Sequence, residues 1–316
     1  MFRLIQNEWM KLFNTTSTYV MIGLLLLGLV GSTAFSMYES SKEHTPPEEA
    51  EWKAELAELN SRYQNDLESN NVFLKEMATR TVAENTYRLE NNISPYEKTT
   101  VWKFIENNKI LIDLLGVFIM VIASTIITKE FKSGTIKLLL IRPYSRISIL
   151  LSKYLTVLLF GLFMLTTLLL VSFIVGGILF GFDGPNTILV YQENEVIERL
   201  RIANLILVYL SKLPNILVLS ALALMISAFS KSDSLASAIS IVFLIVGSNI
   251  TNLIAEKFDW AKFSLFANTD LMVYFDGKPI VDGMNIYFSI SMVMLYFFTF
   301  IGLSMVIFNK RDVSQV

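Results

Sequence analysis

The sequence predicts an all-α, polytopic membrane protein. It has six transmembrane helices, an amphipathic interfacial helix at the N-terminus and a helical extracellular insertion between the first two spans. The chain is 53% hydrophobic, with a mean hydropathy of +0.52. Only 17% of its residues are charged, whereas a soluble globular domain has about a quarter. The apolar residues also gather into six runs, each long enough to cross a bilayer as a helix, which takes about 20 residues.

The six runs define the predicted spans, at residues 18–37, 109–127, 154–180, 205–229, 235–254 and 287–308. In the first run, Ser32-Thr33-Ala34 is similar to a signal-peptide cleavage site. The run is longer than the apolar core of a signal peptide, however, and the charged leader before it is also long. We therefore expect a retained signal-anchor helix rather than a cleaved signal peptide.

Basic residues predict the orientation, because loops rich in Lys and Arg stay in the cytoplasm. An even number of spans places both termini on one side. The eleven basic residues on that side are Arg3, Lys11, Lys129, Lys132, Lys137, Arg142, Arg146, Lys153, Lys231, Lys310 and Arg311. The five in the short loops of the other side are Arg199, Arg201, Lys257, Lys262 and Lys278. Both termini, including the tail at 309–316, are therefore predicted to be cytoplasmic.

Residues 1–17 contain the predicted interfacial helix. One face of this helix is apolar and carries Phe2, Ile5, Trp9, Leu12 and Phe13. The other face is polar and carries Arg3, Asn7, Glu8 and Lys11. A basic amphipathic helix of this kind lies in the membrane interface. It serves either as an elbow that couples cytoplasmic motion to the first span or as a simple anchor.

Residues 38–108 form the predicted extracellular insertion, in which acidic residues outnumber basic ones. The stretch from Thr45 to Glu48 has the signature of a helix start, and helical spacing of apolar residues follows. A second helix is expected around 72–90. Two helices make too small a core to be stable alone, so the pair should pack on the membrane domain or a partner copy, as a structural cap or a substrate-facing lid. The other extracellular segments, a short polar one at 181–204 and a loop at 255–286, carry no recognisable site.

Catalytic and metal sites are not indicated by the sequence. The chain has no cysteine and one histidine, His44, which excludes thiolate chemistry and leaves almost no room for a His-based metal site. The zinc-protease, nucleophile-elbow and ATP-binding P-loop motifs are all missing from the sequence. No aromatic platform accompanies the basic residues, so no nucleic-acid partner is expected. The sequence therefore predicts a protein that is not an enzyme and has no cofactor or metal of its own.

A few polar residues lie within or beside the predicted spans. Asp113 and Lys212 are near the outer starts of the second and fourth spans, and Asn249 and Asn252 are towards the outer end of the fifth. Intramembrane polar groups are costly and often functional. These four residues either occupy interfacial positions or line an outward-facing polar cavity on a translocation path. Because no acid lies at mid-membrane, an ion-coupled carrier is not favoured.

The loop at 128–153 has a turn–helix–turn pattern. Lys129 to Lys132 end the second span, Ser133-Gly134 break the helix, Thr135 can cap a new short helix, and Arg142-Pro143 stop it. The result is a short helix across the cytoplasmic face. A loop that only fixes the topology would explain its basic residues but not this pattern of breaks.

The same loop resembles the one that follows the second span in ABC-2-type transporter permeases. The likeness is carried by Glu130, Gly134-Thr135, Leu138-Leu139, Pro143, Ser145-Arg146 and Lys153. The six spans, the amphipathic N-terminal helix and the large outer insertion agree with it, and the chain is most similar to the permeases of bacterial bacitracin, lantibiotic and multidrug exporters. The outer insertion is longer than in the simplest members of that family.

The resemblance implies a transport subunit in a bacterial cell membrane, without catalysis of its own. The loop would be a coupling helix seated on a cytoplasmic P-loop ATPase subunit, which would hold the ATP-Mg. A second permease copy or a related permease would complete the assembly, surrounded by membrane lipids. The coupling positions carried over are Glu130, Gly134, Thr135, Leu138, Pro143 and Arg146. The alternatives are a membrane sensor or scaffold that binds a ligand or protein through the extracellular helices, and a membrane-embedded enzyme, for which no catalytic groups cluster.

Overall fold

Six long helices dominate the fold. The computed structural model describes residues 1–42, 48–69, 72–137 and 144–311. Within them, six helices are long and apolar enough to cross a membrane. They are α2 (Thr16–Lys42), α6 (Ile110–Thr125) with its short continuation α7 (Thr128–Lys132), α9 (Arg146–Leu179), α10 (Arg201–Phe229), α11 (Asp233–Ala255) and α12 (Ile286–Lys310). The chain is a multi-pass helical membrane protein, as the sequence predicts.

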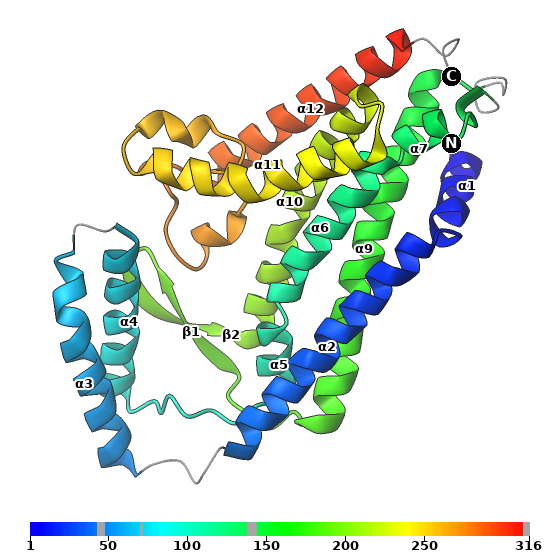
Figure 1. Ribbon diagram of the computed structural model, residues 1–316. Helices are drawn as coiled ribbons and strands as arrows, with labels where there is room; N and C mark the ends of the chain where they lie inside the picture. The colour runs from blue at the N-terminus through cyan, green and yellow to red at the C-terminus, as the bar shows by residue number, and fades with distance from the viewer. Residues whose placement is uncertain (43–47, 70–71, 138–143, 312–316) are drawn as a thin grey trace.

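The helix bundle has two distinct ends (Figure 1). One, the terminal end, holds the N-terminal helix α1 (Phe2–Phe13), the short helix α7 and the end of α12. The other, the insertion end, holds α3 (Glu49–Leu67), α4 (Val72–Asn91), the short helix α5 (Val101–Asn107) and a two-stranded sheet. Six crossings bring both ends of the described chain to the same end of the bundle.

The helices α6, α9 and α10 form the packed centre of the bundle. Leu115 and Ile119 of α6 are almost fully buried against Phe160 and Met164 of α9 and their neighbours. The outer helices instead expose large apolar side chains, such as Leu27 of α2 and Phe298 of α12, which are 69% and 63% exposed. An apolar face of this extent is costly in water and is the normal surface of a helix in a bilayer.

The third spanning helix begins earlier than the predicted span at 154–180. Ser145 caps α9, because its side-chain oxygen accepts a hydrogen bond from the backbone N–H of Ser148 at 3.1 Å. The helix therefore runs for 34 residues from Arg146. The predicted loop at 128–153 thus includes both α7 and the first turns of α9.

The sequence predicts an all-α fold, and this part of the prediction is wrong. The described chain is mainly helical but also contains a two-stranded sheet. Residues expected to form a short polar segment form an antiparallel hairpin, with β1 at Thr187–Gln192 and β2 at Glu195–Leu200. Glu193 and Asn194 connect the strands with φ angles of 50° and 71°, the geometry of the two-residue turns that suit strand twist. The β-branched residues on either side favour strands, and they outweigh the polar character of the segment.

The insertion helices are held against this hairpin and the loop before α12. Trp52 and Leu56 of α3 are buried, and α4 packs between α3 and the hairpin (Figure 1). Arg80 of α4 forms a 2.7 Å ion pair with Asp276, while the N–H of Gly277 donates to the carbonyl of Tyr191 at 2.9 Å. The predicted cap of α3, Thr45, lies outside the described residues.

Candidate functional site

The site begins with a break between α6 and α7 at the terminal end. Backbone N–H groups of Ile127 and Thr128 donate to the hydroxyl of Ser227 in α10, at 3.2 and 3.4 Å. These bonds replace helical ones lost at the break, since buried N–H groups need partners. The break turns α7 so that Glu130 is buried. Gly134 then reverses the chain with φ +70°, which glycine adopts at no steric cost.

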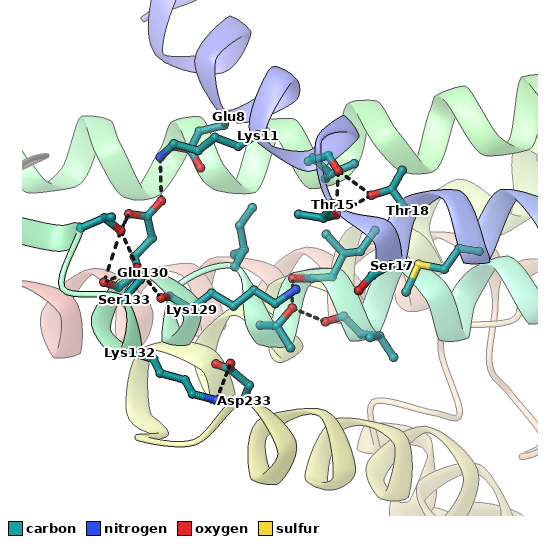
Figure 2. Close-up of a pocket in the computed structure, with 17 residues that line it drawn as sticks. Glu8, Lys11, Thr15, Ser17, Thr18, Lys129, Glu130, Lys132, Ser133 and Asp233 are labelled. Atoms are coloured by element: carbon teal, nitrogen blue, oxygen red, sulfur yellow. Dashed lines mark hydrogen bonds and ion pairs between the residues drawn. The ribbon is translucent and has the colours of Figure 1, made fainter.

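Glu130 is part of a cluster of four charges, which we call the charge cluster: Glu8, Lys11, Glu130 and Lys153. Three of them are buried, and Lys11 is partly exposed. The Oε1 atom of Glu130 lies 2.7 Å from the ammonium of Lys11 and 2.9 Å from that of Lys153. Glu8 closes the ring, at 2.9 Å from Lys11 and 2.7 Å from Lys153. Figure 2 shows the Lys11–Glu130 side of this arrangement. Each glutamate therefore meets both lysines.

Burial makes the charge cluster energetically important. The Lys153 side chain is completely buried, and those of Glu8 and Glu130 are 6% and 8% exposed. Removing one partner of a buried ion pair costs about 3–5 kcal/mol, because the other charge stays buried without compensation. Burial alone would lower the pKa of Lys11, but its hydrogen bonds and charge interactions with Glu130 and Glu8 outweigh this and raise the pKa above its usual value.

The charge cluster joins three segments that are far apart in sequence. Glu8 and Lys11 come from α1, Glu130 from α7 and Lys153 from α9. Thr135 adds the loop itself, because its hydroxyl donates to the second carboxylate oxygen of Glu130 at 2.7 Å. The loop at Thr135 is therefore connected to both helices through short ionic contacts.

A second set of contacts fixes the other flank of the loop. Arg146 donates from Nη1 to the carbonyls of Asn309 and Arg311, at 2.9 and 3.2 Å, beside the C-terminal turn of α12. Arg311 in turn donates to the carbonyls of Ala228 and Ser230 at the end of α10, at 2.8 and 2.9 Å. Its guanidinium carbon also lies 3.8 Å from the ring centre of Phe131 in α7. Both flanks of the loop are thus tied to the ends of spanning helices.

The predicted coupling residues fall into two groups. In the first group, Glu130 belongs to the charge cluster, Thr135 donates to Glu130, and Gly134 lies between them in sequence at the turn. Arg146 contacts the end of α12. Leu138 and Pro143 lie outside the described residues, which end at Lys137 and resume at Tyr144. The sequence predicts that Thr135 caps a helix. In the structure, the shortest hydrogen bond of its hydroxyl is the one to Glu130.

The predicted polar residues of the outer membrane half are only partly brought together. A cavity of about 560 Å³ between α6, α10 and α11 is lined by Asp113, Lys212 and Asn249, among others. The ammonium of Lys212 lies 3.0 Å from a carboxylate oxygen of Asp113. Asn252 is exposed and does not line this cavity. Among the described residues, no three His, Cys, Asp or Glu side chains are grouped as metal ligands.

Comparison with known proteins places the chain in a family. The family model DUF2705, described as a protein of unknown function, matches residues 72–314, which include Glu130 and Lys153. The chain belongs to the DUF2705 family. An uncharacterized protein of Bacillus subtilis strain 168, YhcI, is 41% identical over 318 aligned residues that cover all of both chains.

An uncharacterized membrane protein of the same organism, YdbK, is also similar to this DUF2705 member. It is 30% identical over 203 residues, which cover 63% of this chain and 78% of YdbK. No solved structure matches the chain.

Three members of the charge cluster were not predicted as site residues. The amphipathic pattern predicts Glu8 and Lys11 on the polar face of an interfacial helix, whereas in the structure Glu8 is only 5% exposed. Lys153 was recognised only as a loop residue and a position in the family resemblance. The available signal was its place within a long apolar run, because an isolated lysine among leucines implies a buried partner.

Proposed function

We propose that this chain is the permease subunit of an ATP-binding-cassette transporter. In this proposal it exports an amphipathic peptide, drug or lipid-like substrate across a bacterial cell membrane, with both termini in the cytoplasm. A separate P-loop ATPase supplies the energy, since the sequence has no P-loop. A second permease copy completes the transport path, and any ATP-Mg belongs to the ATPase.

The observation that carries the proposal is the two-sided anchoring of the loop between α7 and α9. On one side, Glu130 and Thr135 connect the loop to α1 and α9 through the charge cluster. On the other, Arg146 contacts the end of α12. A loop that only fixed the topology would need basic residues but no buried ionic contacts to three helices. A partner that pushes on this loop would move the helix ends directly.

Purification of the tagged full-length chain in mild detergent tests the proposal. We expect a P-loop ATPase to be recovered in stoichiometric amount, with an ATPase rate that depends on the permease. Deleting residues 134–143 should abolish this dependence while the protein still reaches the membrane. Glu130→Gln should weaken it, whereas Lys231→Gln, at the same end of the bundle, should not. Absence of the ATPase, or unchanged coupling in the deletion variant, would contradict the proposal.

A sensor or scaffold subunit is the second candidate function. It is favoured by the position of α3 and α4, which stand apart from the six-helix bundle: α4 packs on the hairpin and α3 packs on α4 (Figure 1). Removing residues 49–91 separates the two candidates. Export that persists without these helices assigns them a sensing or structural role, whereas loss of export with normal membrane insertion makes them part of the transport path.

A further inference from the structure

A cavity of about 700 Å³ lies at the terminal end, beside the charge cluster. We call it the corner cavity, because it is enclosed by the corner between α1 and α2, the corner between α6 and α7, and the start of α11 (Figure 2). Part of its wall is polar and includes Lys11, Lys129 and Ser17. The rest is apolar, formed by Leu12, Met21, Val121, Ile122 and Ile126. The lining is therefore amphipathic.

Two of the three carboxylates of the corner cavity are paired with lysines. Glu8 and Glu130 each contact Lys11 and Lys153, so a cationic ligand would have to displace these contacts. Asp233 has only a 3.9 Å contact with the exposed Lys132, and its Oδ1 atom has no hydrogen-bond partner among the described residues. With Lys153 included, four lysines (Lys11, Lys129, Lys132 and Lys153) face three carboxylates, so the charge balance of this region is positive.

Lys129 provides the additional positive charge. Its ammonium has no hydrogen-bond or ion-pair partner among the residues that the structure describes. Figure 2 shows its side chain extending along the cavity towards Ser17 and away from Glu130. Ser17 and Lys129 are both exposed residues, and the Ser17 hydroxyl also has no hydrogen-bond partner in the described part of the chain. An anion between Lys129 and Ser17 gains two hydrogen-bond donors and breaks no existing ion pair.

We propose that the corner cavity binds a membrane phospholipid with an anionic headgroup. The headgroup phosphate accepts hydrogen bonds from the Lys129 ammonium and the Ser17 hydroxyl, while an acyl chain lies along the wall formed by Leu12, Met21 and Ile122. This site does not depend on transport or on an ATPase, so it goes beyond the proposed function.

The position of the cavity favours a lipid over a free phosphate ion. The cavity lies where the amphipathic helix α1 meets the first spanning helix. If α1 lies in the membrane interface, as its sequence predicts, the cavity is at the level of lipid headgroups. Basic pockets between spanning helices at the cytoplasmic surface suit anionic lipids, which are concentrated in that leaflet. A free phosphate would use the two polar donors and leave the apolar wall unoccupied.

Native mass spectrometry of the purified full-length chain tests the site. Dioleoyl-phosphatidylglycerol and dioleoyl-phosphatidylcholine share their acyl chains and differ in net charge. We expect phosphatidylglycerol to bind at least tenfold more tightly. Lys129→Gln should weaken phosphatidylglycerol binding about tenfold, since it removes the charged donor to the headgroup phosphate. Lys129→Arg should keep most of the affinity.

Matched variants distinguish the cavity from general surface charge. Lys231→Gln removes an exposed lysine from the same end of the bundle and should leave binding unchanged. Ser17→Trp narrows the cavity without altering its charge and should also weaken binding. Equal affinity for the two lipids, equal effects of Lys129→Gln and Lys231→Gln, or displacement of the lipid by millimolar inorganic phosphate would each overturn the proposal.

Discussion

Replacing Lys153 with Met tests whether the charge cluster holds the terminal end together. Met has nearly the same length as Lys, so the change removes the charge with little change in packing. The variant leaves the carboxylates of Glu8 and Glu130 buried with only Lys11 between them. Lys11 cannot compensate for both, because its side chain is 42% exposed and partly screened by solvent.

The magnitude follows from the burial of the pair. One uncompensated buried charge costs about 3–5 kcal/mol. The unfolding entropy of about 2.1 cal/mol/K per residue amounts to about 0.7 kcal/mol/K for 316 residues, so a loss of 1 kcal/mol lowers the melting temperature by about 1.5 °C. Lys153→Met should therefore lower the melting temperature by about 4–8 °C. The assay is size-exclusion chromatography of the full-length protein in detergent after heating, with the monodisperse fraction plotted against temperature.

Two further variants make this measurement decisive. Adding Glu130→Gln to Lys153→Met restores the charge balance, so the double variant should be less destabilised than the sum of the two single changes, by about 1–3 kcal/mol. Lys132→Gln is the matched control, because that side chain is 75% exposed and its nearest carboxylate is 3.9 Å away. If Lys153→Met melts within 2 °C of Lys132→Gln, the reasoning about the charge cluster is wrong.

Three other predictions concern separate parts of the molecule. Arg311→Ala should destabilise the protein by about 2 kcal/mol, since it removes two hydrogen bonds to the end of α10 and the contact with Phe131; in the same heating assay Arg311→Lys should recover less than half of this loss. Burial raises the pKa of Glu106 above 4.5. The positive charges of Lys109 and Arg201 lower this pKa, and the negative charges of Glu97 and Asp276 raise it, but the net shift is upward. A carboxyl with a raised pKa in the folded chain stabilises the fold while protonated and loses that contribution as the pH rises through the raised value. Glu106→Gln should therefore melt higher than the wild type at pH 8 and at the same temperature near pH 4; an equal difference at both pH values would contradict this. Asn194→Val should destabilise the hairpin by about 1–2 kcal/mol, because a β-branched residue tolerates the φ of 71° poorly, while Asn194→Gly should be nearly neutral, as measured by hydrogen exchange of the β1 amides.

The spanning helices and the insertion helices could be predicted because their signals are local. A helix expected around 72–90 is present at Val72–Asn91, and the fifth span expected at 235–254 is present at Asp233–Ala255. Apolar runs and helical spacing depend only on neighbouring residues. The same local view also predicted the amphipathic helix at α1.

The charge cluster and the hairpin could not be predicted in this way. Glu8 contacts Lys153 across 145 residues of sequence and Lys11 contacts Glu130 across 119, and one sequence gives no signal for such a pairing. A polar residue on an amphipathic helix is usually hydrated, but Glu8 of α1 is instead paired with the buried Lys153 of α9. In the hairpin, the polar turn and glutamates obscured two short strands whose β-branched residues alternate only weakly.

The sequence distance across the charge cluster also has a consequence for biogenesis. Glu8 and Lys11 leave the ribosome well before Lys153, and at a synthesis rate of about 5–20 residues per second the delay across 145 residues is about 7–30 s. For most of that interval, until Glu130 emerges 23 residues before Lys153, α1 has neither residue as a partner, so its charges remain at the hydrated membrane surface. Docking of α1 therefore completes only after α9 has been synthesised and inserted. The N-terminal helix is among the first segments made and among the last to reach its final position.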